Sequence, residues 1–176
     1  GSEMCIRDRS RGGSVNSQAV VQDGDALGAL LFHGSDGTDA ALGAEIGAYV
    51  HGTPGGDDMP GRLIFKTSAD GSGSPSERMR ITSNGQVWIG DDASWGPNGD
   101  ADDLIVGDRT SGVDHGITIL SHTSSASSLH FADTAHDSAG VIKYDHNVGS
   151  MQFATETSTA LTINSAQTAS FSGTVS

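Results

Sequence analysis

The stretch from Gly61 to Gly90 constrains the fold most, because its apolar residues alternate along short segments that turns separate. A period of two is the pattern of a β-strand that buries one face. The last two segments flank Ser83-Asn84-Gly85. A two-residue Asn-Gly loop would place apolar residues opposite polar ones, whereas a three-residue loop with Gly85 left-handed pairs apolar with apolar. We therefore predict a hairpin with a three-residue loop.

This loop predicts the cross-strand neighbours in the hairpin. Four apolar residues share one face in two pairs: Ile81 with Val87, and Met79 with Ile89. On the other face Arg80 lies opposite Trp88, where a cation–π contact can form. The hairpin is the best-determined element of the sequence.

Short alternating segments recur along the chain at intervals of roughly 8–12 residues, and no segment keeps a helical period. We predict strands at about residues 18–22, 28–33, 45–50, 62–67, 77–82, 86–90, 104–107, 116–121, 128–132, 140–145, 150–155, 160–164 and 168–172. The predicted fold class is all-β, built of short antiparallel strands.

The strand pattern occurs twice. Leu63–Thr67 matches Met151–Thr155, and Met79–Ile81 matches Leu161–Ile163. Two copies of a unit too small to close a core suggest stacked modules. We divide the chain into a tag or contig-end artefact, expected to be disordered, a first β-module, an acidic Gly/Pro linker and a second β-module leading into a shaft: residues 1–13, 14–90, 91–103 and 104–176. The natural N-terminus is then expected to lie upstream, which makes the chain a fragment.

The composition predicts that the chain shares its core with copies of itself. Hydrophobic residues make up 35% of the chain and aromatic residues 5%, and 25 residues are glycine. Small chains already bury a modest share of their surface, so a monomer of this composition would have a weak core. Because the strand patterning argues against general disorder, oligomerisation explains the composition better.

The formal net charge of −13 excludes several partners. Nucleic-acid binding needs clustered Lys or Arg, which the sequence lacks beyond its first residues. An acidic surface repels anionic membranes, and no apolar run approaches the about 20 residues that span a bilayer. Cys5 is the sole cysteine, so the chain has no disulfide framework and no thiolate metal cluster.

Parts of both modules resemble bacteriophage tail-fibre repeats. The segments that carry the resemblance are Leu104–Asp108, Ser128–Asp133, Gly140–His146, Ser150–Phe153, and the hairpin of Ser76–Ile81 with Asn84-Gly85 and Ile89-Gly90. In that family such modules often precede an endosialidase-type intramolecular chaperone, which this sequence does not contain. The sequence departs from the pattern at Ala166-Gln167, which replaces Asn-Gly and leaves a tight turn there in question.

The resemblance implies an elongated homotrimer of intertwined or stacked β-modules, resembling a β-prism or triple β-helix. It implies a place in the virion tail, outside cells, and a role in host attachment. The function we expect is a structural segment that presents loops to a host-surface receptor, expected to be a glycan. The alternatives are a fragment of a glycan-cleaving tailspike and a cellular adhesin built from β-repeats.

Two sets of residues are candidate metal ligands. In a homotrimer, one inward histidine becomes three around the axis, and the candidates are His115, His122, His130, His136 and His146. Loop carboxylates can bind calcium, and the candidates are Asp57, Asp58, Asp91 and Asp92. Neither set has the spacing of a known ligand motif, so surface histidines and solvated acidic loops are the favoured interpretation. We expect no cofactor.

Trp88 and Trp95 are the candidate ligand-binding residues, because a tryptophan can stack on a sugar ring. The competing interpretations are module packing for Trp95 and the Arg80 contact for Trp88. Catalysis is not expected. A glycosidase needs two carboxylates roughly 5–10 Å apart, and Glu45, Glu77 and Glu156 are isolated in the sequence. A Gly-x-Ser-x-Gly motif is also missing.

Overall fold

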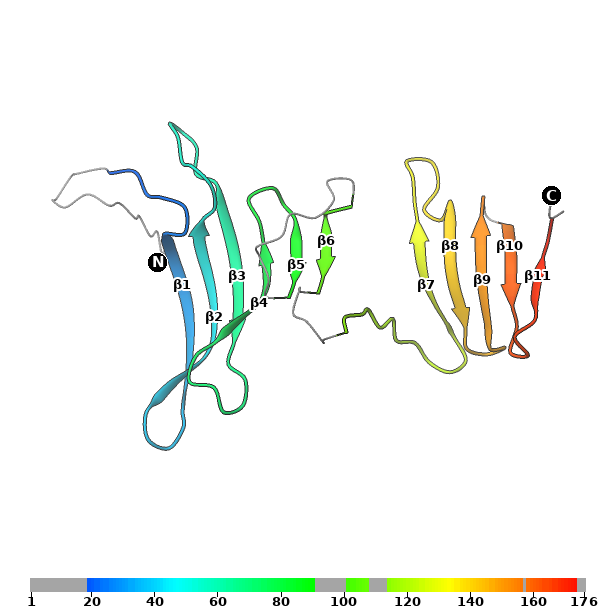
Figure 1. The fold of residues 1–176 in the computed structure, drawn as a ribbon, viewed down its shortest axis with the longest axis horizontal. Helices are drawn as coiled ribbons and strands as arrows, with labels where there is room; N and C mark the ends of the chain where they lie inside the picture. Colours follow the sequence, from blue (N-terminus) through cyan, green and yellow to red (C-terminus); the bar gives the residue numbers. More distant parts are fainter. Residues whose placement is uncertain (1–18, 91–100, 108–113, 157, 174–176) are drawn as a thin grey trace, which may run out of the picture. The chain divides into compact units, whose positions relative to one another are not determined.

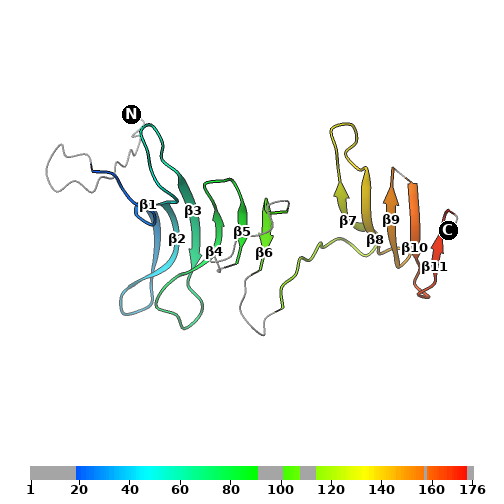
Figure 2. The same cartoon turned by 45° about the horizontal axis from the view of Figure 1, so that its top comes forward.

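The computed structural model describes residues 19–90, 101–107, 114–156 and 158–173. The chain divides into two compact units, Gly1–Gly116 and Ile117–Ser176, and each is considered by itself. Each unit holds one sheet, and the described residues contain strands and turns but no helix (Figures 1 and 2). The predicted all-β class is confirmed. The described residues hold no helix that is long and apolar enough to cross a membrane.

The first unit is a six-stranded sheet in which the strand order follows the chain. Its strands are β1 (Ala26–Ser35), β2 (Ala40–Val50), β3 (Gly61–Thr67), β4 (Ser76–Ile81), β5 (Val87–Ile89) and β6 (Leu104–Val106). All neighbours are antiparallel except β5 and β6, which are parallel. The sheet is thus a meander with one parallel strand added at its edge.

The second unit is a five-stranded antiparallel meander. Its strands are β7 (Ala126–Phe131), β8 (Gly140–Asp145), β9 (Ser150–Thr155), β10 (Ser158–Ile163) and β11 (Ala169–Phe171). These five strands follow the same order as β1 to β5, as the sequence repeat predicts.

The β4–β5 hairpin has the predicted register. Met79 pairs with Ile89, and Ile81 pairs with Val87. Gly85 has φ of +85° and donates its N–H to the carbonyl of Thr82, at 3.0 Å. The choice of a three-residue loop is therefore confirmed, because only that loop keeps the four apolar residues on one face.

The two copies share a β-bulge at the same place. Arg78 is the extra residue in β4, where the pairing shifts between Phe65 and Lys66, and Ala160 is the extra residue in β10. The carbonyl of Arg78 accepts a hydrogen bond from Gly90, and that of Ala160 accepts one from Ser172, each at 3.0 Å. A bulge turns the strand locally and fixes register, so this match supports a true structural repeat.

The first turn of each copy is held by an aspartate. Asp36 Oδ1 accepts backbone N–H groups of Thr38 and Asp39 at 2.7 and 2.8 Å. Asp133 Oδ1 accepts those of Ala135 and His136 at the same two distances. These backbone donors favour the ionised carboxylates and hold the pKa of both below the usual value.

The second hairpin loop keeps the geometry of the first in spite of the Ala166-Gln167 substitution. Gln167 occupies the left-handed position, with φ of +59°, and donates its N–H to the carbonyl of Asn164 at 2.9 Å. Asn164 Oδ1 accepts the N–H of both Ala166 and Thr168 at 3.0 Å. The turn that the sequence leaves in question is therefore formed, with a side chain in a conformation that glycine adopts more readily.

Replacing Gln167 with Gly is expected to stabilise this turn, because glycine has no Cβ penalty at positive φ. The expected gain is about 0.5–1 kcal/mol, which slows hydrogen exchange of the β10–β11 amides by roughly two- to fivefold. Gln167→Ala is the control, since it keeps the penalty and gives no such slowing. Faster exchange in Gln167→Gly would contradict the left-handed assignment.

Two predicted strands do not form. Residues 19–22 and 116–121 belong to no sheet, although each precedes the first strand of a unit. Their apolar residues alternate as in a strand, but neither segment finds a partner strand in its own unit. The backbone N–H of Asp25 donates to the carbonyl of Gln22, and that of Ser125 donates to the carbonyl of His122, so each segment leads into a turn before the first strand. The pattern alone predicted strands wrongly here, because a strand also requires a neighbour.

The predicted module boundary also differs from the structure. Residues 104–107 were predicted to begin the second module, whereas β6 pairs with β5 in the first sheet, through Val87 with Leu104 and Ile89 with Val106. The boundary between compact units follows Gly116. The antiparallel meander ends at β5 and leaves one edge of that strand unpaired. The short apolar segment that forms β6 pairs with this edge. Residues 1–13 and most of the predicted linker lie outside the described residues.

Each sheet is a single layer with a small core. All closely packed element pairs in the described chain are neighbouring strands. Among the described residues only Val21, Val50 and Ile64 are buried hydrophobic residues, at 2%, 0% and 5% exposure. Within its own unit each sheet therefore leaves most of its apolar side chains uncovered.

Candidate functional site

The most extensive candidate site is a row of apolar residues that crosses each sheet, one residue from each strand. We call this row the apolar ladder. In the first unit it consists of Leu30, Ile46, Phe65, Met79 and Ile89, each paired with the next. In the second unit it consists of Leu129, Ile142, Phe153, Leu161 and Phe171, paired in the same way. The two ladders occupy equivalent places in the repeat.

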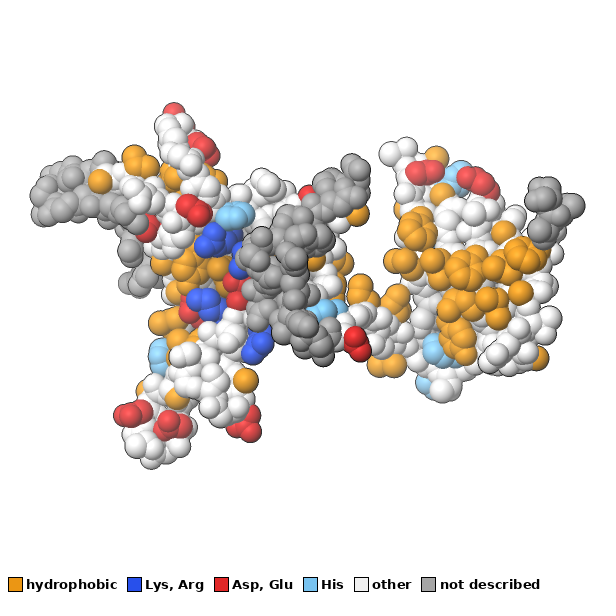
Figure 3. Space-filling view, in the orientation of Figure 1, with side chains coloured by type: hydrophobic (Ala, Val, Ile, Leu, Met, Phe, Trp, Pro, Cys, Tyr) orange, Lys and Arg blue, Asp and Glu red, His pale blue; other side chains and the backbone are white. Residues whose placement is uncertain are grey.

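A second apolar row lies beside each ladder from β2 and from β8 onward. Its residues are two positions along each strand from the ladder residues and so lie on the same face. The rows are Ala48, Leu63, Ile81, Val87 and Leu104 in the first unit, and Tyr144, Met151, Ile163 and Ala169 in the second. Over β7–β11 the hydrophobic side chains form a continuous band (Figure 3).

The ladders are exposed to a degree that soluble monomers rarely show. Leu30 is 57% exposed, Leu129 is 50% exposed and Phe171 is 58% exposed. Cross-strand aromatic and branched pairs stabilise a sheet, but their outer surface remains open to water here. A contiguous apolar face of this kind marks an interaction surface.

The other face of the first sheet carries a buried polar cluster. Glu45 on β2 accepts a hydrogen bond from the Tyr49 hydroxyl at 2.5 Å and one from Lys66 on β3 at 3.1 Å. Lys66 also donates to the Tyr49 hydroxyl at 3.0 Å. The space between them requires Gly47, where an added Cβ would lie 2.6 Å from the Tyr49 ring. Glu45, Tyr49 and Lys66 thus form hydrogen bonds with one another in the space that Gly47 leaves free.

Hydrogen bonding sets the charges in this cluster. The Tyr49 hydroxyl, and then Lys66, lower the pKa of Glu45 against the opposing effect of burial. For Lys66 burial lowers the pKa, but the bonds to Tyr49 and Glu45 outweigh it and raise the pKa above its ordinary value. Both groups are therefore ionised at neutral pH. The cluster was not predicted from the sequence, because the contact depends on the β2–β3 register, which no sequence pattern indicated.

Trp88, a predicted ligand residue, lies half-buried on the same face, covered by Arg80. The Arg80 guanidinium carbon is 5.9 Å from the ring centroid, which confirms the predicted cation–π contact. Arg80 also forms an ion pair with Glu77. The indole Nε1 is buried without a hydrogen-bond partner among the described residues. Trp95 lies outside those residues.

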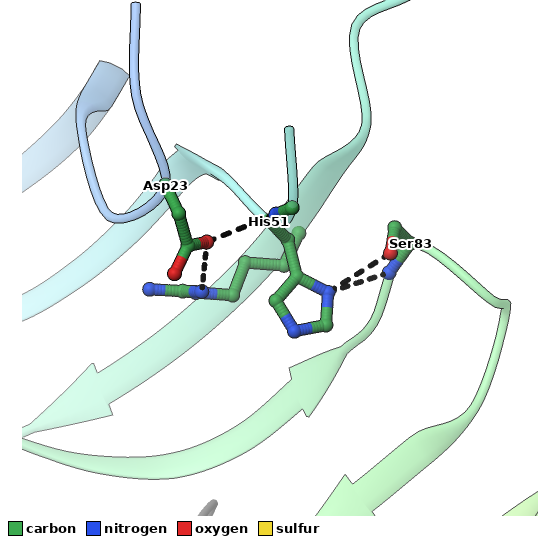
Figure 4. Close-up of polar contacts among 5 residues, drawn as sticks. Asp23, His51 and Ser83 are labelled. Carbon is green, nitrogen blue, oxygen red and sulfur yellow. Dashed lines mark hydrogen bonds and ion pairs between the residues drawn. The ribbon is translucent and has the colours of Figure 1, made fainter. Parts of the chain in front are cut away.

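Three connecting segments meet at one end of the first sheet, where the His51 side chain contacts Ser83 and the backbone of Gly52 contacts Asp23 (Figure 4). His51 Nδ1 accepts the backbone N–H of Ser83 at 3.2 Å and lies 3.0 Å from the Ser83 hydroxyl. Asp23 accepts the N–H of Gly52 at 2.9 Å and lies 3.7 Å from Arg62. Because Nδ1 accepts a backbone proton, this arrangement requires neutral His51. Burial, then the positive charge of Arg62, lowers its pKa against the opposing charge of Asp23.

The first unit is expected to lose stability as the pH falls below 6.5, the ordinary pKa of His51. In that range the unfolded chain binds a proton that the folded chain, with its lower pKa, resists. Both tryptophans belong to the first unit, so the urea midpoint of tryptophan fluorescence at pH 7.5 and 5.5 measures the effect. His51→Gln is expected to flatten this dependence. An equally steep loss in that variant would contradict the assignment.

The predicted histidine ligands do not converge within one chain. His122, His130 and His146 each lie within hydrogen-bond distance of a serine hydroxyl, at 2.8, 2.8 and 3.3 Å. His115 packs against Gly107, and the backbone N–H of His136 donates to Asp133. Among the described residues no group of three or more His, Cys, Asp or Glu could hold a metal ion.

The predicted calcium ligands lie in two places. Asp57 and Asp58 are in the β2–β3 loop, where Asp57 has φ of +60° and the backbone carbonyl of Asp58 accepts the N–H of Gly55 at 3.2 Å. Asp91 and Asp92 lie outside the described residues. The described pair is exposed, as expected of a solvated acidic turn.

The fold and its apolar faces define a class: an all-β repeat protein whose single-layer sheets expose one apolar side. No protein-family model and no curated protein matches the sequence. Among solved structures it is similar to the carboxy-terminal domain of the bacteriophage T5 L-shaped tail fibre with its intra-molecular chaperone domain, with a TM-score of 0.50 and 11% identity. That match covers 96% of this chain and 62% of the other.

A second structure of the T5 tail-fibre carboxy-terminal domain gives a TM-score of 0.45 and 10% identity over 96% of this chain and 89% of that one. The chain spans somewhat less than two thirds of the length of the first T5 structure. At this identity the first match shows a common fold, which is similar to that of a bacteriophage tail-fibre domain.

Proposed function

We propose that this chain is a structural segment of a bacteriophage tail fibre, that it forms a homotrimer, and that it takes part in host attachment. The observation that carries the proposal is the exposed apolar ladder, repeated in both single-layer sheets. Three copies of such a face, turned inward around a common axis, would supply the core that one chain lacks.

A structural similarity and a general property of obligate interfaces also support this proposal. The fold is similar to that of a bacteriophage tail fibre, and that structure includes an intra-molecular chaperone domain. By analogy, we place this chain in a repeat region upstream of a chaperone, with its modules in the virion tail. An obligate interface is as hydrophobic as a domain core that is divided between the partners. The two exposed apolar ladders have this character.

The test is the mass of the protein in solution. Sedimentation equilibrium is expected to give three times the chain mass of 17.9 kDa, unchanged on dilution through the micromolar range. A monomer at all concentrations would overturn the core-sharing proposal. A dimer would overturn the proposed trimer but would still agree with burial of the apolar ladders between copies of the chain.

We further propose that the segment does not catalyse a reaction. Glu45 is bound by Lys66 and Tyr49, and Glu77 is bound by Arg80, so neither is free to act as an acid or base. Glu156 is exposed at the β9–β10 turn. Incubation with bacterial surface polysaccharides, followed by measurement of reducing ends, is expected to show no turnover. Turnover would favour the tailspike alternative.

A further inference from the structure

We propose that the second unit binds an acidic sugar, such as a uronate residue of a surface glycan, in a polar groove centred on Lys143. This inference rests on the proposed role in attachment and assigns it a site. The groove has a volume of about 280 Å³ and is lined by His130, Ser138, Val141, Lys143, Gln152, Ala154 and Thr159. Its size is at the lower limit of pockets for small ligands and suits one sugar ring.

The pairing of the strands places the groove on the face opposite the apolar ladder. His130, Val141, Ala154 and Thr159 form one cross-strand row, and Lys143 pairs with Gln152 in the next. The ladder residues alternate with these along each strand and point the other way. A trimer that buries the ladder therefore leaves the groove open to solvent.

Lys143 is a cation without a counterion in this groove. It is half-buried, and among the described residues no hydrogen bond or ion pair holds its ammonium group. It is also the sole Lys or Arg between residues 110 and 176. In a chain with net charge −13, a lone cation in a concave polar site is complementary to an anionic ligand.

The neighbouring groups indicate a sugar in preference to a phosphate. The Gln152 amide and the hydroxyls of Ser138 and Thr159 can donate and accept, as sugar hydroxyls require. The Ser138 hydroxyl donates to exposed Asp137 at 3.3 Å, a long bond that a ligand hydroxyl can replace. No lining residue is arginine, whose fork recognises phosphate bidentately. One ammonium matches the single charge of a carboxylate.

His130 contributes a further polar group at the groove. It lies 2.8 Å from the Ser128 hydroxyl through Nε2, which leaves Nδ1 for a ligand. His130 lies on the face opposite Leu129, because His130 pairs with Val141 while Leu129 pairs with Ile142. Val141 and Ala154 supply a small apolar floor on which a ring can rest.

The experiment is saturation-transfer NMR titration of the full chain with methyl β-D-glucuronoside and methyl β-D-glucoside. Inorganic phosphate, which has no non-exchangeable protons to observe, is added as a competitor, and its affinity is read from the loss of the glucuronoside signal. The glucuronoside is expected to bind saturably, and the neutral glucoside about tenfold more weakly, because it lacks the charged hydrogen bond. Lys143→Gln is expected to weaken glucuronoside binding by about tenfold. The charge-matched control Arg78→Gln, in the first unit, is expected to leave it within about twofold.

Three outcomes would overturn the inference: no saturable glucuronoside binding, equal binding by Lys143→Gln, or phosphate binding at least as tight as that of the sugar. Circular dichroism of each variant checks that it folds. The oligomer mass is measured on the same samples. A trimer that does not bind the glucuronoside would overturn the sugar site alone, whereas a monomer would overturn the proposed assembly.

Discussion

The double variant Leu30→Asp/Leu161→Asp is expected to be a monomer by sedimentation, because it places a carboxylate within each apolar ladder. Leu161 pairs with both Phe153 and Phe171, and Leu30 pairs with Ile46. Burying one leucine side chain contributes roughly 1.5–3 kcal/mol, and a trimer loses six of them. Like charges facing one another around the axis add to the cost.

The matched control is Ala29→Asp/Thr162→Asp. Each residue immediately precedes or follows a ladder leucine, so its side chain lies on the opposite face of the same strand, and the added charge is identical. Ala29 pairs with Gly47, and Thr162 pairs with Gln152. The control is expected to remain a trimer. If both variants dissociate alike, added charge explains the effect and the ladder is not the interface.

Glu45→Ala is expected to destabilise the first unit by about 3 kcal/mol, because it leaves the Lys66 ammonium partly buried without its carboxylate. The exposed fractions of these two side chains are 10% and 23%. Urea unfolding followed by tryptophan fluorescence measures the loss.

The double variant Glu45→Leu/Lys66→Met is expected to recover most of this stability, because two apolar side chains replace the pair without an unpaired charge. The wild type should also weaken in acid. The pKa of Glu45 is lowered, so its contribution is present above 4.5 and is lost as the pH falls through the lower folded value. A Glu45→Ala protein as stable as wild type would contradict this account.

Local rules predicted the hairpins well. Asn84-Gly85 and the apolar register determined the β4–β5 pairing, which involves residues close in sequence. The turn at Gln167 was harder to predict because its side chain is unusual at positive φ, and Asn164 supplies the hydrogen bonds that hold it.

Longer-range features escaped prediction for a different reason. The Glu45–Lys66 contact depends on register across the β2–β3 loop, whose ten residues have no repeating pattern. The parallel addition of β6 depends on which open edge a short apolar segment meets. The groove at Lys143 combines residues from β7, β8, β9 and β10 and one from the β7–β8 turn, and no spacing in the sequence unites them.

The two copies keep the same bulge and ladder but differ in loop length. Residues 51–60 connect β2 and β3, whereas residues 146–149 connect the equivalent β8 and β9. The shorter connection closes the same antiparallel register as the longer one. This position has therefore already accepted an insertion, and it is a suitable graft site. A foreign peptide inserted between His146 and Gly149 would turn the scaffold into a display vehicle.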